Sequence, residues 1–299
     1  MQLAELDRGR SLTTALALGA VALIASVSIA AGPAATGSIP RFRHVVLIVF
    51  ENKDYGQVIG QSSAPVFNRL ARRYALLTRY EAVARPSLPN YLALVSGSTQ
   101  GVTENCDDCS FSAKTLADTI AASRRTWKTY AEDLPEPGFT GATSGNYAKR
   151  HNPLLYFRNV LSSSARLSRI VPLRELQADL EAGRLPHFSL VIPNLCSDMH
   201  DCTVSHGDAW LGAFLEPLLA SPQLAESAVF VTFDEGAKVE GAKAGGHVAT
   251  IVLGPLVRRG ARSAVKLDHY SLLRTIEDSW GLPRLGRSST ARPILGIWR

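Results

Sequence analysis

Hydrophobic positions along the chain alternate between short continuous runs and runs with helical spacing. Val45–Phe50 is apolar throughout, and Ala228–Phe233 is interrupted only by Thr232. Runs of this length and composition are typical of strands that are buried on both faces, in a parallel sheet covered by helices.

The remaining pattern predicts further strands and helices in alternation. We expect strands at Leu76–Tyr80, Trp127–Ala131, His187–Ile192 and His247–Leu253, and helices at Ala64–Tyr74, Leu88–Ser96, Ser112–Ser123, Pro172–Gly183, Gly207–Ala220 and His269–Trp280. Residues 135–153 form a long polar loop. This alternation predicts an α/β fold, a three-layer α/β/α sandwich around a mostly parallel central sheet.

Acidic and amide side chains follow both of the apolar runs. Glu51 and Asn52 come directly after the first run, and Asp234 and Glu235 directly after the second. Carboxyl ends of parallel strands meet at one edge of a sheet, where ligands bind. Clustered carboxylates repel one another unless a cation lies between them, so a metal site is expected. Oxygen ligands suit Mg²⁺, Mn²⁺ or Ca²⁺, and an added His would admit zinc or iron. The alternative is that these residues only begin loops.

Ser87 lies immediately before the expected helix Leu88–Ser96, and Pro89 fits the first turn of that helix. By spacing alone, the favoured interpretation of Ser87 is an N-cap. A helix N-terminus also binds phosphate, and a serine beside a metal ion can attack phosphorus without a histidine base.

The chain contains seven histidines. His200 belongs to a cluster with Asp198 and Asp201 that follows the expected strand at 187–192, and therefore reaches the same edge of the sheet. A histidine there could donate a proton to a leaving oxygen. His44 and His187 begin strands at the opposite edge and are interpreted as structural, and His269 is expected to cap its helix.

The N-terminus has the character of a targeting segment. Arg8 and Arg10 precede a mostly apolar run at 12–31, which ends in small residues. Residues 1–35 are predicted to be a signal peptide for export to the cell envelope or medium, with an uncleaved membrane anchor as the alternative. Residues 36–43 would be a linker and residues 44–299 a single catalytic domain.

The four cysteines agree with export to an oxidising compartment. Their spacing predicts local disulfides, Cys106–Cys109 and Cys196–Cys202. A zinc site made by all four cysteines and a redox role for the first pair are the alternatives.

Charge and motif content exclude several classes of function. The net charge of +6 and the pI of about 9.3 come from dispersed Lys and Arg residues, which favours an anionic substrate carrying phosphate rather than nucleic acid. The chain lacks a P-loop, a G-x-S-x-G elbow, an H-E-x-x-H motif and a dinucleotide-binding G-x-G-x-x-G.

Taken together, these motifs resemble the bacterial phosphoesterase family of acid phosphatases and phosphatidylcholine-type phospholipases C, a branch of the alkaline phosphatase superfamily. The resemblance runs from His44 to Leu282. It rests on Glu51-Asn52, Ser87-x-Pro-Asn90, the stretch at 198–201, Asp234-Glu235 and the closing segment at 270–278.

The resemblance implies roles for individual residues. It implies that Glu51, Asn52, Asp234 and Glu235 bind one divalent metal ion, that Ser87 is the nucleophile, that His200 and His151 contact the phosphate or the leaving group, and that Asn90, Asp198 and His247 are further substrate contacts.

The expected function is therefore hydrolysis of a small phosphate monoester through a phosphoserine intermediate. The chain lacks the long C-terminal extension of the larger phospholipases C, which favours the phosphatase over phospholipase C acting on phosphatidylcholine. A non-catalytic binding protein of the same fold is a further alternative. A sulfatase-like enzyme is disfavoured because Ser87-Leu88-Pro89-Asn90-Tyr91 lacks the required Arg.

Overall fold

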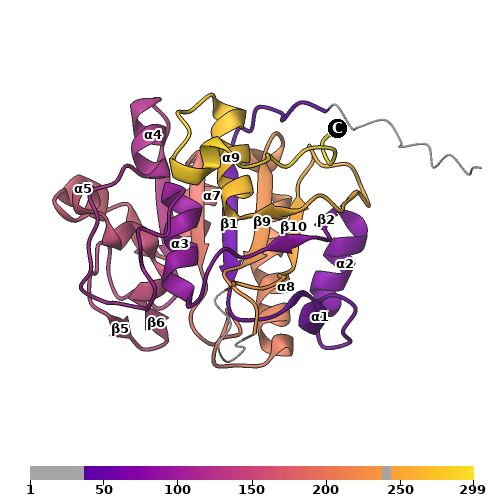
Figure 1. The fold of residues 1–299 in the computed structure, drawn as a ribbon, viewed down its shortest axis with the longest axis horizontal. Helices are drawn as coiled ribbons and strands as arrows, with labels where there is room; N and C mark the ends of the chain where they lie inside the picture. The colour runs from indigo at the N-terminus through magenta and orange to yellow at the C-terminus, as the bar shows by residue number, and fades with distance from the viewer. Residues whose placement is uncertain (1–36, 238–243) are drawn as a thin grey trace, which may run out of the picture. The chain divides into compact units, whose positions relative to one another are not determined.

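An eight-stranded sheet forms the centre of the fold in the computed structural model, which describes residues 37–237 and 244–299 (Figure 1). The strand order is β11-β2-β10-β9-β1-β8-β4-β7. The bounds are Val45–Phe50 for β1, Ala75–Leu77 for β2, Trp127–Ala131 for β4, Ile170–Pro172 for β7, Phe188–Ile192 for β8, Ala228–Phe233 for β9, Thr250–Leu253 for β10 and Arg262–Ser263 for β11. Only β10 among these runs antiparallel to its neighbours, so the mostly parallel sheet is confirmed.

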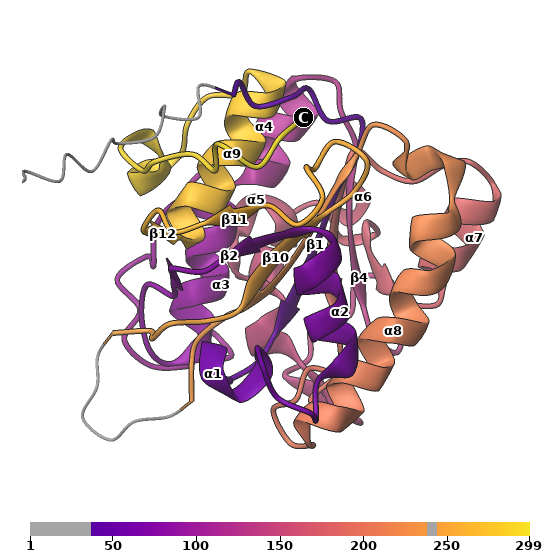
Figure 2. The same cartoon turned by 90° about the vertical axis from the view of Figure 1, so that its right-hand side faces the viewer.

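Helices cover both faces of this sheet, as the two views show (Figures 1 and 2). One face carries α3 (Ser87–Ser96), α4 (Leu116–Ala122) and α9 (His269–Trp280), and the other carries α2 (Pro65–Arg73), α7 (Glu175–Glu181) and α8 (Val204–Ala220). Every residue of β1 and β9 is buried, as expected for strands covered on both sides. The three-layer α/β/α architecture is therefore confirmed.

Shorter elements complete the described chain. They are the helices α1 (Tyr55–Val58), α5 (Arg158–Leu161) and α6 (Ser164–Leu167), the pair β3 (Tyr80–Glu81) and β12 (Leu267–Asp268), the pair β5 (Thr143–Ser144) and β6 (Tyr147–Ala148), and the 3₁₀ turns Lys149–His151, Pro153–Tyr156, Pro222–Leu224 and Gly286–Ser289.

Several expected boundaries are wrong. The strand expected at 76–80 is split between β2 and β3, which belong to different sheets. The segment at 170–172 is an edge strand, β7, so α7 begins three residues later than expected. Helix α4 begins at Leu116, not Ser112, because Thr115 and Asp118 form a capping box at that point.

Both predicted disulfides, Cys106–Cys109 and Cys196–Cys202, are present. The four-cysteine zinc site is thereby excluded, since all four thiols are used. The expected signal peptide or anchor at 1–35 lies outside the described residues. Among the residues that are described, we find no helix both long and apolar enough to cross a bilayer.

Candidate active site

The ends of β1 and β9 place Glu51 and Asp234 side by side. The two strands pair in parallel up to Phe50 and Phe233, and the next residue of each chain segment is the acid. The Asp234 amide donates to the Phe50 carbonyl at 2.9 Å, and the Asn52 amide donates to Asp234 Oδ1 at 3.2 Å. The ends of these two strands therefore converge as expected.

Asn52 holds an unusual backbone conformation at this edge. Its φ of 50° lies in the left-handed region, which Asn tolerates better than most residues. Its buried Oδ1 and the buried Oδ2 of Asp234 have no hydrogen-bond partner in residues 37–237 and 244–299. Buried polar atoms are rarely left unpaired, so these two oxygens are candidate contacts for a metal ion or a substrate.

Ser87 is the first residue of α3 and points at the carboxylates. Its Oγ donates to Glu51 Oε2 at 3.0 Å and lies 3.5 Å from Glu235 Oε1. The N-cap interpretation is wrong, because the N-cap residue is Pro86 and Asn105 Oδ1 accepts from the Leu88 amide instead.

His151 lies between two buried carboxylates. Its Nε2 is 3.4 Å from Glu51 Oε1, and its Nδ1 is 3.2 Å from Asp198 Oδ2. Neither contact has the geometry of a hydrogen bond. His151 Nε2 and Asp198 Oδ2 are therefore unpaired within the described chain. One donor atom from each of Glu51, His151 and Asp198 lies within 4.8 Å of the others, so this triad could hold a metal ion.

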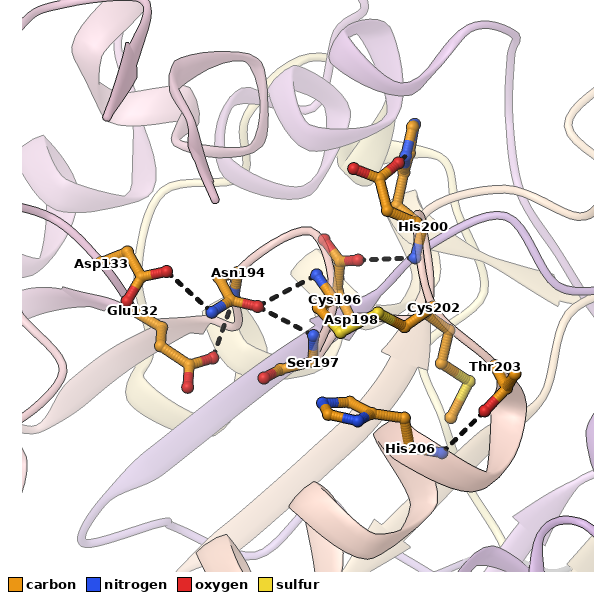
Figure 3. The surroundings of a disulfide bond; sticks show 12 residues. Glu132, Asp133, Asn194, Cys196, Ser197, Asp198, His200, Cys202, Thr203 and His206 are labelled. Carbon is orange, nitrogen blue, oxygen red and sulfur yellow. Dashed lines mark hydrogen bonds and ion pairs between the residues drawn. A yellow bond between two sulfur atoms is a disulfide. The ribbon is translucent and has the colours of Figure 1, made fainter. Parts of the chain in front are cut away.

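The Cys196–Cys202 disulfide closes the loop that carries Asp198 and His200 (Figure 3). Within it the His200 amide donates to Asp198 Oδ1 at 2.7 Å. His200 Nδ1 lies 2.5 Å from Asp201 Oδ1, and its Nε2 lies 3.5 Å from a nitrogen of Arg150. The imidazole of His200 is therefore half-buried at the edge of the carboxylate cluster, and Asp201 orients it.

The electrostatics of the cluster favour a bound cation. Burial, together with the charges of Asp234 and Asp198, raises the pKa of Glu51 well above its usual value. Burial likewise raises the pKa of Asp198 strongly, that of Asp234 to about 6 and that of Glu235 to about 8. A divalent cation would neutralise these four buried acids, and Asp198 and Asp234 each offer it an oxygen with no partner in the described residues.

The pKa of His151 is shifted in the opposite sense. Burial lowers it well below its usual value, and the nearby Arg150 and His200 lower it further. His151 is therefore a neutral imidazole, the form that binds metals and accepts hydrogen bonds.

Two residues expected to contact the substrate make protein contacts in the structure. Asn90 Oδ1 accepts from the backbone amides of Val83 and Ala84, and its Nδ2 donates to two carbonyls, so its amide holds the turn before Ser87 rather than facing a substrate. His247 stacks on Tyr55 with ring centroids 4.4 Å apart. His269 does not cap α9; it is buried and bridges the Asp234 carbonyl to Tyr80.

Sequence reasoning missed three residues around the carboxylates. Tyr91 donates to Glu51 Oε1 at 2.5 Å, and Arg85 pairs with Glu235 Oε2 at 3.1 Å. Lys53 donates to the Met199 carbonyl at 2.7 Å. Burial lowers the pKa of Lys53, and the negative charges of the cluster oppose that effect. The available signal was helical spacing, since Tyr91 follows Ser87 by one turn.

Comparison with known proteins identifies the family of this chain. The sequence profile of the phosphoesterase family matches residues 61–283. The chain belongs to the phosphoesterase family. Its members hydrolyse phosphoric esters, and the chain is accordingly a hydrolase of the acid phosphatase type.

Relatives within and around this family include a phosphatidylinositol-3-phosphatase of Mycobacterium tuberculosis, which is 35% identical over 88% of this chain and 85% of its own length. A probable acid phosphatase of Kluyveromyces lactis is 33% identical, and the chain spans 62% of that protein.

The fold is also that of solved members of a wider superfamily. A protein of the alkaline phosphatase superfamily from Vibrio parahaemolyticus superposes with a TM-score of 0.61 at 15% identity, covering 87% of this chain and 72% of that one. The alkaline phosphatase-like fold is therefore confirmed.

Proposed function

We propose that this phosphoesterase is an exported, metal-dependent phosphomonoesterase in which Ser87 is the nucleophile. The observation that carries the proposal is the hydrogen bond of 3.0 Å from Ser87 Oγ to Glu51, inside a buried group of carboxylates with unpaired oxygens. A hydroxyl in this setting is directed at its own proton acceptor and surrounded by ligands for a cation.

One divalent metal ion fits the residues present. The triad of Glu51, His151 and Asp198 would hold it, because donor atoms of these three residues lie within 4.8 Å of one another. Asn52, Asp234 and Glu235 are the further ligands predicted from the sequence, and Ser87 Oγ lies 3.0 Å from Glu51. A bound cation of this kind would lower the pKa of the serine hydroxyl and stabilise negative charge on the phosphoryl oxygens. Mostly oxygen donors favour Mg²⁺, Mn²⁺ or Ca²⁺, and participation of His151 would admit zinc or iron.

The chain's own residues supply the remaining steps. Ser87 Oγ gives up its proton, for which Glu51 Oε2 is the nearest acceptor, and forms a bond to phosphorus while the bond to the leaving oxygen breaks. His200, oriented by Asp201, protonates that oxygen. A water molecule then attacks the phosphorus of the phosphoserine and gives a proton to His200. Inorganic phosphate leaves, and the proton held by Glu51 returns to Ser87 Oγ.

A phosphoinositide monoester is the second candidate substrate, beside small soluble phosphate monoesters. The relative from M. tuberculosis favours it, because its name states that activity and the match covers most of both chains. The disulfides support export, since such bonds persist in oxidising compartments.

The test compares the wild type with Ser87→Ala and, as a matched control, Ser96→Ala. Ser96 is a buried serine at the far end of the same helix, and its hydroxyl donates to the Leu92 carbonyl. We expect Ser87→Ala to abolish hydrolysis of p-nitrophenyl phosphate and phosphoserine trapping, while Ser96→Ala retains both. A folded Ser87→Ala protein with full activity would exclude the nucleophile.

The same assay identifies the substrate class. We expect EDTA to stop release of p-nitrophenol and a divalent metal to restore it. Phosphatidylinositol 3-phosphate and phosphatidylcholine are assayed in parallel: phosphate released from the first supports the lipid monoesterase, and phosphocholine released from the second would move the function to phospholipase C.

A further inference from the structure

Tyr91 is a fully buried side chain on α3, one helical turn after Ser87. Its hydroxyl donates to Glu51 Oε1 at 2.5 Å. Hydrogen bonds from a neutral donor to a carboxylate in a water-free interior are strong and directional, so this contact restricts the orientation of the Glu51 carboxyl group.

The two oxygens of Glu51 are held by the same helix. Ser87 donates to Oε2 at 3.0 Å, and Tyr91 donates to Oε1. Residues i and i+4 lie on one face of a helix, which places both hydroxyls against one carboxylate. Helix α3 therefore sets the distance and the angle between the serine and Glu51.

The ring of Tyr91 also fixes His151. The two rings stack with centroids 5.3 Å apart and an interplanar angle of 12°. His151 Nε2 lies 3.4 Å from Glu51 Oε1, the oxygen that accepts from Tyr91. One side chain thus contacts both a carboxylate and an imidazole whose donor atoms face the same space.

We propose that Tyr91 is a positioning residue that holds Glu51 and His151 in the arrangement required to bind the divalent cation. This inference rests on one part of the proposed function, the binding of a divalent cation at this site, and does not require that Ser87 is the nucleophile. Residues in contact with metal ligands orient them, and their loss costs about 10- to 100-fold in metal affinity or activity.

A second buried tyrosine provides a matched control. Tyr130 on β4 is as buried as Tyr91 and donates to Asp179 Oδ2 at 2.7 Å. Asp179 pairs with Lys128 and belongs to α7, not to the carboxylate cluster at the ends of β1 and β9. Removing either hydroxyl deletes one buried hydrogen bond to a carboxylate, but only Tyr91→Phe affects the candidate metal ligands.

The experiment measures binding of Mn²⁺, and separately of Mg²⁺ and Ca²⁺, to the EDTA-treated full chain by isothermal titration calorimetry. Wild type, Tyr91→Phe and Tyr130→Phe are compared, and thermal unfolding is recorded for each. Phenylalanine keeps the ring of Tyr91 and its stacking on His151, so the hydroxyl is the only group removed.

We expect Tyr91→Phe to raise the Kd of the tightest-binding ion about 10- to 100-fold, and excess metal to restore part of the lost kcat. Tyr130→Phe should lower the unfolding temperature without changing the Kd. The proposal is overturned if Tyr91→Phe binds the ion with wild-type affinity, if Tyr130→Phe weakens binding equally, or if the wild type binds none of the three ions. Phosphoserine trapping on Ser87 does not depend on these titrations, so failure of the nucleophile is detected separately.

Discussion

Arg85 links the two sides of the active site. Its guanidinium pairs with Glu235 Oε2 at 3.1 Å and donates to the carbonyls of Gly236 at 2.9 Å and Ala244 at 2.8 Å. Arg85 precedes α3, whereas its partners follow β9. The side chain therefore couples the position of Ser87 to that of a predicted metal ligand, and it supplies positive charge next to a buried acid.

We expect Arg85→Met to lower kcat/KM about 10- to 100-fold and to raise the metal concentration needed for half-maximal activity, because Glu235 loses the group that orients it. Arg85→Lys should recover only part of the activity, since an ammonium cannot reproduce the planar fork of donors. Steady-state assays over a metal titration measure both quantities. Arg69→Met, on an exposed position of α2, is the control. Equal activity in Arg85→Met and Arg69→Met would contradict the assignment.

The acids at the ends of β1 and β9 could be predicted because each directly follows a run of buried residues. The role of Ser87 could not be assigned from its spacing, since a serine that caps a helix and a serine in the first turn of a helix leave the same sequence pattern. Tyr91 and Arg85 act on carboxylates 40 and 150 residues away in sequence, and such contacts exist only once the chain has folded.

Among the elements, β1, β4, β9 and α9 have the bounds expected from the sequence, because burial of whole runs or of a helical face leaves a strong pattern. The short edge strand β7 is only three residues long and leaves no such pattern in the sequence. The strand expected at 247–253 begins only at Thr250 and runs antiparallel, and periodicity carries no information on strand direction.

Helix α3, which carries Ser87 and Tyr91, ends at a glycine with two constraints. Gly97 adopts the left-handed conformation with φ 69°, and a Cβ atom there would lie 1.9 Å from the Leu285 carbonyl oxygen. Gly281 ends α9 with φ 64°, and beyond its own neighbours in the chain no atom of the described residues lies within 4 Å of such a Cβ. Gly97 and Gly281 therefore share the left-handed backbone conformation, but only Gly97 packs closely against another segment, at Leu285.

We expect Gly97→Ala to destabilise the protein by more than Gly281→Ala, which should cost about 1 kcal/mol, the penalty for an alanine in the left-handed region. Urea unfolding followed by circular dichroism gives both values. If the two substitutions destabilise equally, the contact between the end of α3 and Leu285 has no energetic importance.

At the scale of the whole molecule, the site is assembled where the central strands of the sheet end. Strand β1 lies between β9 and β8, and the segments after these three strands deliver Glu51, Asp234 and Asp198. Helix α3 and the turn at Lys149–His151 bring Ser87 and His151 to the same place. The candidate site therefore depends on five segments from across the folded chain, so unfolding of the chain would disperse it.

One buried acid remote from the site makes that stability depend on pH. Glu277 on α9 is fully buried; its Oε1 accepts from the Leu285 amide at 2.9 Å and its Oε2 from Ser288 Oγ at 2.5 Å. Burial raises the pKa of Glu277 to about 7, against the opposing effect of these hydrogen bonds. In the unfolded chain a glutamate ionises near pH ~4.3.

Between those two pH values the folded protein holds a proton that the unfolded chain has released, so raising the pH lowers the free energy of unfolding. The stabilisation is complete below about pH 4.3 and is lost as the pH rises through about 7. We expect the wild type to lose on the order of 2 to 3 kcal/mol more than Glu277→Gln between about pH 5 and 8, because glutamine carries no titrating group. Urea unfolding of both proteins measures this difference. EDTA keeps metal ions off the site carboxylates, which therefore titrate alike in the wild type and the variant. Parallel pH profiles for the two proteins would mean that Glu277 is ionised in the fold throughout this range.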